Sequence, residues 1–241
     1  MNPFATTPEQ LLSGFYDADD HHIRISAAQG SRFAKEVAGD HNPIHDVDAP
    51  RFCVPGDLLF ALITTRYGLA KDMEITFNGM LRADTALHFP ATPREAFAIN
   101  SDSGKPYVSV SRRHPVSASA EMISDFIKAY VACSGESFPG LLQPLLKAQN
   151  VMFNPERPLV VYDSMTIHLD QTPQQQVNLT LNDARLAVNG KRGDVQFDFA
   201  MTQAQKPIGV CSKKMVVSGL REYDQTAMDS IIEAYEARRN A

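Results

Sequence analysis

Apolar residues follow a helical period twice in the first third of the chain. The first stretch begins after Ser26, a residue suited to cap a helix, has Phe33 and Val37 on its apolar face, and ends at Gly39. The second stretch, residues 55–68, opens with Pro-Gly-Asp, runs through LLFALI and stops at Tyr-Gly. It is apolar almost all round, so the pattern predicts a helix that is buried on most sides.

Outside these two helices, apolar and polar positions alternate as they do in strands with one buried face. A short strand is predicted at residues 22–25, ahead of the first helix. After the second helix, further strands are predicted at residues 73–78, 86–89, 96–99 and 107–111, with a hairpin turn at 102–105.

The order of elements then repeats. Residues 124–128 (SDFIK) echo residues 31–35 (SRFAK), and residues 138–142 (FPGLL) echo residues 54–59 (VPGDLL). The first pair of matching segments is 93 residues apart and the second pair is 84 residues apart, so the second copy is nine residues shorter between its two helices. Strands are predicted at 164–169, 177–181, 186–188, 195–201 and 210–217, and a final amphipathic helix at 226–239, with Met228, Ile231, Ile232 and Tyr235 on its apolar face.

This order predicts a duplicated α+β fold. We expect an N-terminal arm or short helix at residues 1–20, a first repeat at 21–115, a second repeat at 116–225 and a C-terminal helix at 226–241.

Composition narrows the class of protein. The 241 residues are 44% hydrophobic and 21% charged, with a net charge of −5, which is ordinary for a soluble globular protein. No basic patch indicates a nucleic-acid partner, and no apolar run approaches the roughly 20 residues that span a bilayer. The N-terminus lacks the features of a secretory signal. Three widely spaced cysteines, Cys53, Cys133 and Cys211, form no metal or redox motif, so we expect reduced thiols in a cytoplasmic protein without a cofactor.

The segment with candidate chemistry is GDHNPIH, residues 39–45, which falls in the interval that the second copy lacks. It places Asp40 and His45 on either side of Pro43, which cannot continue a helix and pushes Asn42 out of the helical region. A loop of this shape can direct a carboxylate and an imidazole to one point, as an acid–base pair requires. Two other interpretations stay open: a turn capped by Asp and Asn side chains, or a metal site that adds His41, Asp46 and Asp48.

The run FAKEVAGDHNPIHDVDAPRF, followed by VPGDLLFAL, resembles the signature of the MaoC-like, (R)-specific enoyl-CoA hydratases of the hot-dog fold. Residues 77–85 resemble the strand and turn that follow in that family. The likeness covers residues 23–112 and extends to the second half only through architecture. The whole chain also resembles an uncharacterised bacterial family that carries this N-terminal motif.

The resemblance implies a double hot-dog, in which two antiparallel sheets each wrap around a long central helix. It implies an acyl-CoA or acyl carrier protein thioester as substrate, with water added to a 2-enoyl group or removed from a 3-hydroxyacyl group. Asp40 and His45 would then be the catalytic acid–base pair, and Asn42 would hold the loop. The backbone N–H of Gly56, at the head of the buried helix, would meet the thioester oxygen. Only the first repeat has the motif, so one active site is expected, and a homodimer of such modules is one option for the assembly.

Two departures from the family motivate an alternative. Asp57 follows Gly56 where the family usually has Met, and an ionised Asp57 would oppose negative charge on the thioester oxygen; the turn at residues 83–85 lacks the family's glycine. A non-catalytic acyl-CoA or lipid-binding module is therefore the second hypothesis. An acyl-CoA thioesterase, a different chemistry on the same fold, is the third. The basic runs 112–114 and 213–214 are either contacts for the phosphates of coenzyme A or exposed strand ends.

Overall fold

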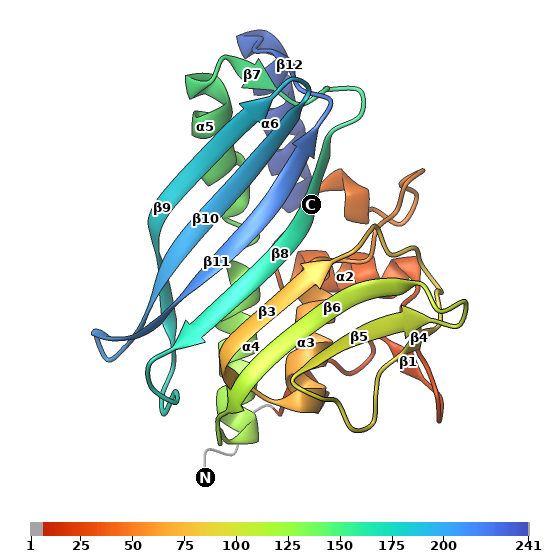
Figure 1. Ribbon diagram of the computed structural model, residues 1–241. Coiled ribbons are helices and arrows are strands. Elements are labelled where there is room, and N and C mark those ends of the chain that lie inside the picture. Colours follow the sequence, from red (N-terminus) through yellow and green to blue (C-terminus); the bar gives the residue numbers. More distant parts are fainter. Residues whose placement is uncertain (1–6, 241) are drawn as a thin grey trace.

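The computed structural model describes residues 7–240. Its main element is a ten-stranded antiparallel sheet in the order β1-β2-β4-β5-β6-β3-β8-β11-β10-β9. The larger helices lie on one face of this sheet (Figure 1). The strands are β1 (Asp17–Ala18), β2 (Ile23–Arg24), β3 (Ala70–Phe77), β4 (Leu87–His88), β5 (Ala96–Ser101), β6 (Pro106–Pro115), β8 (Leu159–Leu169), β9 (Asn178–Asn189), β10 (Arg192–Gln203) and β11 (Lys206–Ser218); β7 (Val151–Met152) and β12 (Arg221–Glu222) form a separate pair.

The α+β class is confirmed, but the expected pair of separate sheets is not found. Strand β3 of the first half pairs with β8 of the second, from Asp72 opposite His168 to Thr76 opposite Ser164. This ladder joins the two halves into one continuous sheet. It also gives each of the two strands a hydrogen-bonding neighbour on the side that would otherwise be an open edge.

Both helices predicted in the first half are confirmed. Helix α2 (Ala27–Glu36) begins at Ser26, which forms a reciprocal capping box with Gln29. Helix α3 (Gly56–Tyr67) ends at Gly68, whose positive φ of 73° suits glycine. Every residue of α3 from Asp57 to Thr64 is buried, as expected for a helix that is apolar all round.

The second half departs from the expected repeat. Its long buried helix is α4 (Ala120–Ala132), whereas the echo at 138–142 opens only an irregular turn, η2 (Ser137–Leu141), and the short helix α5 (Leu142–Ala148). Phe138 has an extended backbone inside this turn, and the following proline has no N–H to donate. The strands predicted at 177–181 and 186–188 form one strand, β9. A bulge in its pairing with β10 accommodates an extra residue without ending the strand.

The two ends of the chain pack on these halves. In the N-terminal arm, helix α1 (Pro8–Leu11) and strand β1 are formed; residues 1–6 of the arm, like residue 241, lie outside the described residues. The C-terminal helix α6 (Gln225–Arg239) begins one residue before the predicted start, and it buries Met228 and Tyr235. The domain boundaries at 20/21, 115/116 and 225/226 stay predictions.

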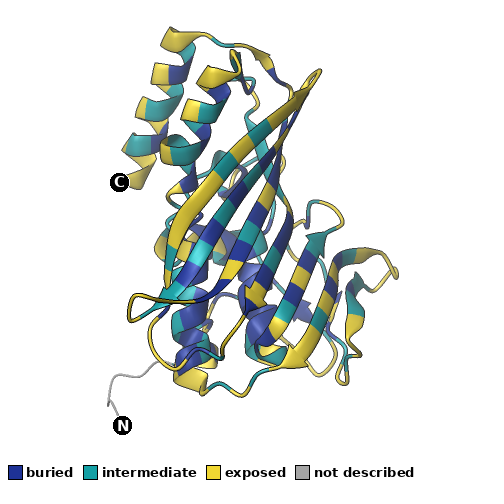
Figure 2. Ribbon diagram, turned by 60° about the vertical axis from the view of Figure 1, so that its left-hand side comes forward, coloured by how far each residue is buried: buried dark blue, intermediate teal, exposed yellow. Residues whose placement is uncertain are grey.

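Burial alternates along the long strands, with dark and light positions following one another along β10 and β11 (Figure 2). Cys133 and Cys211 are buried free thiols, and Cys53 is a half-buried one. Among residues 7–240, no helix is long and apolar enough to cross a membrane.

Candidate active site

The loop between α2 and α3 is shaped by its own polar groups. The Asp40 N–H donates to the carbonyl of Ala34 at 2.8 Å, and one Asp40 carboxylate oxygen accepts from the Asn42 N–H at 2.9 Å. The side chain of Asn42 caps the short helix η1 (Pro43–His45) by accepting from the Ile44 N–H. The turn-capping interpretation is therefore correct for one oxygen of Asp40, while the other oxygen faces His45.

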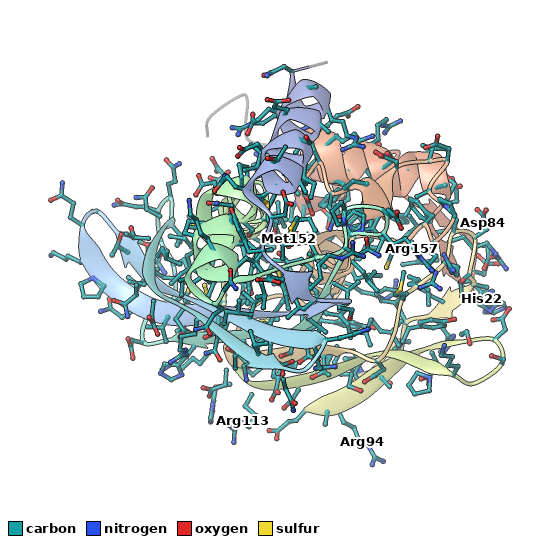
Figure 3. All side chains as sticks on the ribbon, turned by 90° about the horizontal axis from the view of Figure 1, so that it is seen from above. His22, Asp84, Arg94, Arg113, Met152 and Arg157 are labelled. Carbon is teal, nitrogen blue, oxygen red and sulfur yellow. The ribbon has the colours of Figure 1, made fainter. Side chains whose placement is uncertain are left out.

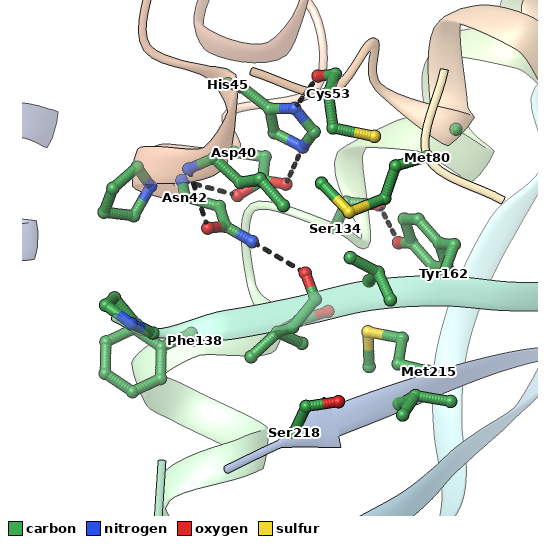
Figure 4. Close-up of a pocket in the computed structure, with 18 of the residues that line it drawn as sticks. Asp40, Asn42, His45, Cys53, Met80, Ser134, Phe138, Tyr162, Met215 and Ser218 are labelled. Carbon is green, nitrogen blue, oxygen red and sulfur yellow. Dashed lines mark hydrogen bonds and ion pairs between the residues drawn. The ribbon is translucent and has the colours of Figure 1, made fainter. Parts of the chain in front are cut away.

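Asp40 and His45 form a close but unbonded pair. The Nδ1 of His45 lies 2.7 Å from the carbonyl oxygen of Cys53, which can only accept, so Nδ1 is the donor. Its Nε2 lies 3.6 Å from Oδ2 of Asp40 (Figure 4). This distance is too long for a direct hydrogen bond, but it suits an ion pair or a single water that bridges the two groups.

Both side chains are largely removed from solvent, with exposed fractions of 17% for Asp40 and 9% for His45. Burial raises the pKa of the Asp40 carboxyl, and the neighbouring His45 opposes this shift in part. A raised pKa makes Asp40 a stronger base than an ordinary carboxylate. Nδ1 of His45 is fixed as a donor, which leaves Nε2 to give or take a proton.

Asp40 and His45 both line a cavity of about 360 Å³. The cavity lies beyond the end of the β3–β8 ladder, where Phe77 on one side and Tyr162 on the other both line it. Its walls are mostly apolar and include Leu59, Met80, Leu142, Phe153, Val160 and Met215. An apolar cavity with a few convergent polar groups is the usual form of a small-molecule site.

Gly56 lies at the wall of the same cavity, at the first position of α3. A Cβ there would be 3.0 Å from the ring of Phe77 and 3.2 Å from the ring of Tyr162, so a side chain at this position would require the two rings to move. The first N–H groups of a helix have no acceptor within it and lie at the positive end of its dipole. The structure thus brings Asp40, Asn42, His45 and Gly56 together around one cavity.

Asp57 does not line this cavity, and its charge is compensated. The Nζ of Lys213, from β11, lies 3.2 Å from Oδ1 of Asp57, and their side chains are 0% and 2% exposed. Both interpretations offered for Lys213, phosphate contact and exposed strand end, are therefore wrong. The alternation of side chains along β11 could have predicted this burial, because Lys213 lies two residues from each of the buried residues Cys211 and Met215 and so shares their face.

The second half also supplies residues that the loop pattern did not predict. Val160 of β8 accepts a hydrogen bond through its carbonyl from the side chain of Asn42 at 3.2 Å. The hydroxyl of Tyr235, on α6, accepts from the His41 N–H at 3.2 Å. Ser134 and Tyr162 line the cavity as well. These contacts join residues up to 194 positions apart, so no local sequence pattern contains them.

The remaining basic candidates lie elsewhere. The Arg112 guanidinium donates to the carbonyls of Tyr67 and Gly68 at the end of α3. Arg113 projects from the sheet face opposite the helices (Figure 3). Neither arginine lines the cavity. Residues 7–240 contain no group of three or more histidine, cysteine or acidic side chains placed to hold a metal ion.

These observations define an α+β protein with an apolar cavity, at whose wall lie a buried carboxylate–imidazole pair and a helix N-terminus. The chain belongs to the family described as a protein of unknown function, DUF3581, whose model matches residues 10–226. This agrees with the expected membership of an uncharacterised family. No curated protein matches the chain.

The chain is similar to solved structures at low sequence identity, and the following three are among them. Acyl-CoA thioesterase II TesB2 from Mycobacterium marinum has 12% identity and a TM-score of 0.42, with 90% of this chain and 99% of that one covered. The tesB protein of Mycobacterium avium subs paratuberculosis has 8% identity and a TM-score of 0.43, covering 88% and 99%. A conserved protein of unknown function with hot dog fold from Alicyclobacillus acidocaldarius has 10% identity and a TM-score of 0.43, covering 88% and 97%.

Proposed function

We propose that this protein is a MaoC-like hydratase/dehydratase that adds water to a 2-enoyl thioester or removes it from a 3-hydroxyacyl thioester. In this proposal the fold is a double hot-dog whose two sheets have joined through β3 and β8. The observation that carries it is the Asp40–His45 pair, with a raised carboxyl pKa and a 3.6 Å gap, at the wall of an apolar cavity.

The cavity fits the two parts of such a substrate. Its apolar walls suit an acyl chain, because burying each methylene contributes about 0.8 kcal/mol. The Gly56 N–H, at the positive end of α3, suits the thioester carbonyl, whose oxygen gains negative charge as the enolate forms. We propose that this carbonyl binds at Gly56 with the C2–C3 double bond facing Asp40 and His45.

Hydration requires the enzyme to remove one proton from water and to donate one proton to C2. Ionised Asp40 accepts a proton from a water held between it and His45, and the water oxygen bonds to C3. In this step His45 starts protonated on both ring nitrogens, and the resulting enolate takes its Nε2 proton at C2, which completes the 3-hydroxyacyl thioester. Transfer of the proton from Asp40 to His45 restores the starting pair, and the reverse sequence removes water. Placed acid–base groups of this kind contribute about 10²–10⁴ in rate.

The carrier of the acyl group is anionic, whether coenzyme A or the phosphopantetheine arm of an acyl carrier protein. Arg192 and Arg238 are basic residues at the cavity, and their side chains are 55% and 41% exposed. We propose these two arginines, in place of the basic runs at 112–114 and 213–214, as the contacts for a carrier phosphate.

The test uses the full chain with crotonyl-CoA and longer 2-enoyl-CoAs, followed by loss of the conjugated absorbance. We expect turnover by the wild type and a drop in kcat of about 10²–10⁴ in Asp40→Asn. Asp48→Asn is the matched control, because it makes the same change at an exposed acid in the same segment. Absence of turnover at every chain length, with Asp40→Asn equal to wild type, would contradict the proposal.

Two other outcomes identify the alternatives. Release of free thiol from saturated acyl-CoA would show a thioesterase. Tight binding of acyl-CoA by wild type and Asp40→Asn alike, with no reaction, would show a non-catalytic binding module.

A further inference from the structure

Strand β8 contains a bulge at the cavity. Lys214 pairs with Ser164 and Met215 with Tyr162, so Asp163 is an extra residue without a partner in β11. Met165 and Ile167 are buried on one face, and unbroken alternation would place Asp163 on that face as well. The bulge puts Tyr162 on that face, where it lines the cavity beside Gly56, and Asp163 is an exposed residue that also lines the cavity.

The hydroxyl of Tyr162 is the outer end of a hydrogen-bond chain that begins at a buried cation. Lys213 Nζ contacts three oxygens: the Tyr130 carbonyl at 2.8 Å, Ser134 Oγ at 2.8 Å and Asp57 Oδ1 at 3.2 Å. An ammonium group only donates, so Ser134 Oγ accepts from Lys213. Ser134 Oγ lies 2.5 Å from the Tyr162 hydroxyl (Figure 4).

Lys213 favours one direction of this chain. Ser134 Oγ accepts from Lys213 and keeps its own proton, which it can donate to the Tyr162 oxygen, although the contact between the two hydroxyls permits either as the donor. When Ser134 donates, the proton of Tyr162 is left for the cavity. Each donor in such a chain is polarised by the one before it, and the effect is strong where water is excluded. Burial also raises the pKa of Tyr162 well above its usual value, so the phenol keeps its proton at neutral pH.

We propose that the Tyr162 hydroxyl is a second hydrogen-bond donor to the thioester carbonyl, beside the Gly56 N–H, and that Lys213 orients it through Ser134. This rests on the proposed function for the nature of the ligand. Tyr162 is then a catalytic residue, and Ser134 and Lys213 are positioning residues. Asp57, which the sequence placed in opposition to the oxyanion, instead anchors the cation that supports it.

The test reads the carbonyl itself. Crotonyl-CoA labelled with ¹³C at the thioester carbon is bound to the protein, and its carbonyl stretch is measured by infrared difference spectroscopy. Hydrogen bonds to the oxygen lower this frequency. We expect a lowered frequency in wild type, a return toward the free value in Tyr162→Phe, and a smaller return in Ser134→Ala. Tyr107→Phe, which removes a hydroxyl away from the cavity, is the matched control and should leave the spectrum unchanged.

The kinetic readout is separate. Loss of one oxyanion donor lowers kcat by about 10²–10³, and we expect Tyr162→Phe to do so with little change in KM. Asp40→Asn should lower kcat by about 10²–10⁴ while it keeps the carbonyl shift. A Tyr162-dependent shift without turnover by wild type would support this inference and overturn the hydratase proposal. Three results would overturn the inference. The first is turnover by wild type with a carbonyl shift that Tyr162→Phe leaves intact. The second is a shift that is lost only in Ser134→Ala, and the third is the absence of thioester binding.

Discussion

Replacing Lys213 with methionine tests the buried charge network. The substitution keeps most of the side-chain length and removes the charge. It leaves the carboxylate of Asp57 without a cation in a site where both side chains are at most 2% exposed. It also removes the donor for the Tyr130 carbonyl and Ser134 Oγ. With so little exposure, solvent cannot compensate for the lost partner.

The expected loss is large. Removing one partner of a buried ion pair costs about 3–5 kcal/mol in the free energy of unfolding. For a chain of this length, 1 kcal/mol corresponds to about 2–4 °C in Tm, which gives a fall of roughly 6–20 °C for Lys213→Met. Replacing both partners by apolar groups leaves no unpaired charge. The double variant Asp57→Met/Lys213→Met should therefore recover most of the loss.

The assay is urea and thermal unfolding of wild type, both single variants and the double variant, analysed as a double-mutant cycle. Lys214→Met is the matched control, because Lys214 is the exposed neighbour on the same strand and should change stability by no more than about 0.5 kcal/mol. Equal stability of Lys213→Met and Lys214→Met would show that the buried pair does not stabilise the fold. Simple addition of the losses of the two single variants would show that Asp57 and Lys213 are not coupled.

Two further predictions concern the loop. Because burial raises the pKa of Asp40, its ionised form destabilises the folded state. Asp40→Asn should therefore unfold at a higher temperature than wild type at neutral pH, and scans over a pH series should show this advantage disappear below the ordinary pKa of an aspartate; a lower Tm at neutral pH would contradict it. In Gly135→Ala, the new Cβ would lie 2.6 Å from the carbonyl oxygen of Gly39, so the backbone that carries Asp40 must shift. We expect kcat to fall by at least about tenfold, since a misplacement of about 1 Å can cost 10²-fold, whereas Gly140→Ala, with open space around its Cβ, should match wild type in the same assay.

The elements that the sequence predicted best are those determined by neighbouring residues. Ser26 and Gln29 form a capping box within one turn, and Gly68 ends α3 through its own backbone conformation. The same holds in part for the loop, where the side chains of Asp40 and Asn42 each accept from a backbone N–H two residues further on, and local contacts of this kind can be anticipated from the sequence.

The parts that were missed depend on distant contacts. The pairing of β3 with β8 joins residues about a hundred positions apart, and no local pattern separates it from two independent sheets. Residues 138–142 do resemble residues 54–59 in sequence, but the extended backbone of Phe138 prevents a long helix there. A bulge changes the parity of β8 at Tyr162, and bulges leave no clear mark in an alternating pattern.

The proposed reaction predicts where a solvent oxygen atom ends. Crotonyl-CoA incubated with the protein in H₂¹⁸O, and analysed by mass spectrometry, should give 3-hydroxybutyryl-CoA with one ¹⁸O atom in the hydroxyl group and the thioester intact. Asp40→Asn should incorporate the label at least about 10²-fold more slowly than wild type. Label in a free carboxylic acid, with release of thiol, would show that the water attacks the thioester carbonyl instead of C3, and would contradict the assignment of Asp40 and His45 as a hydratase pair.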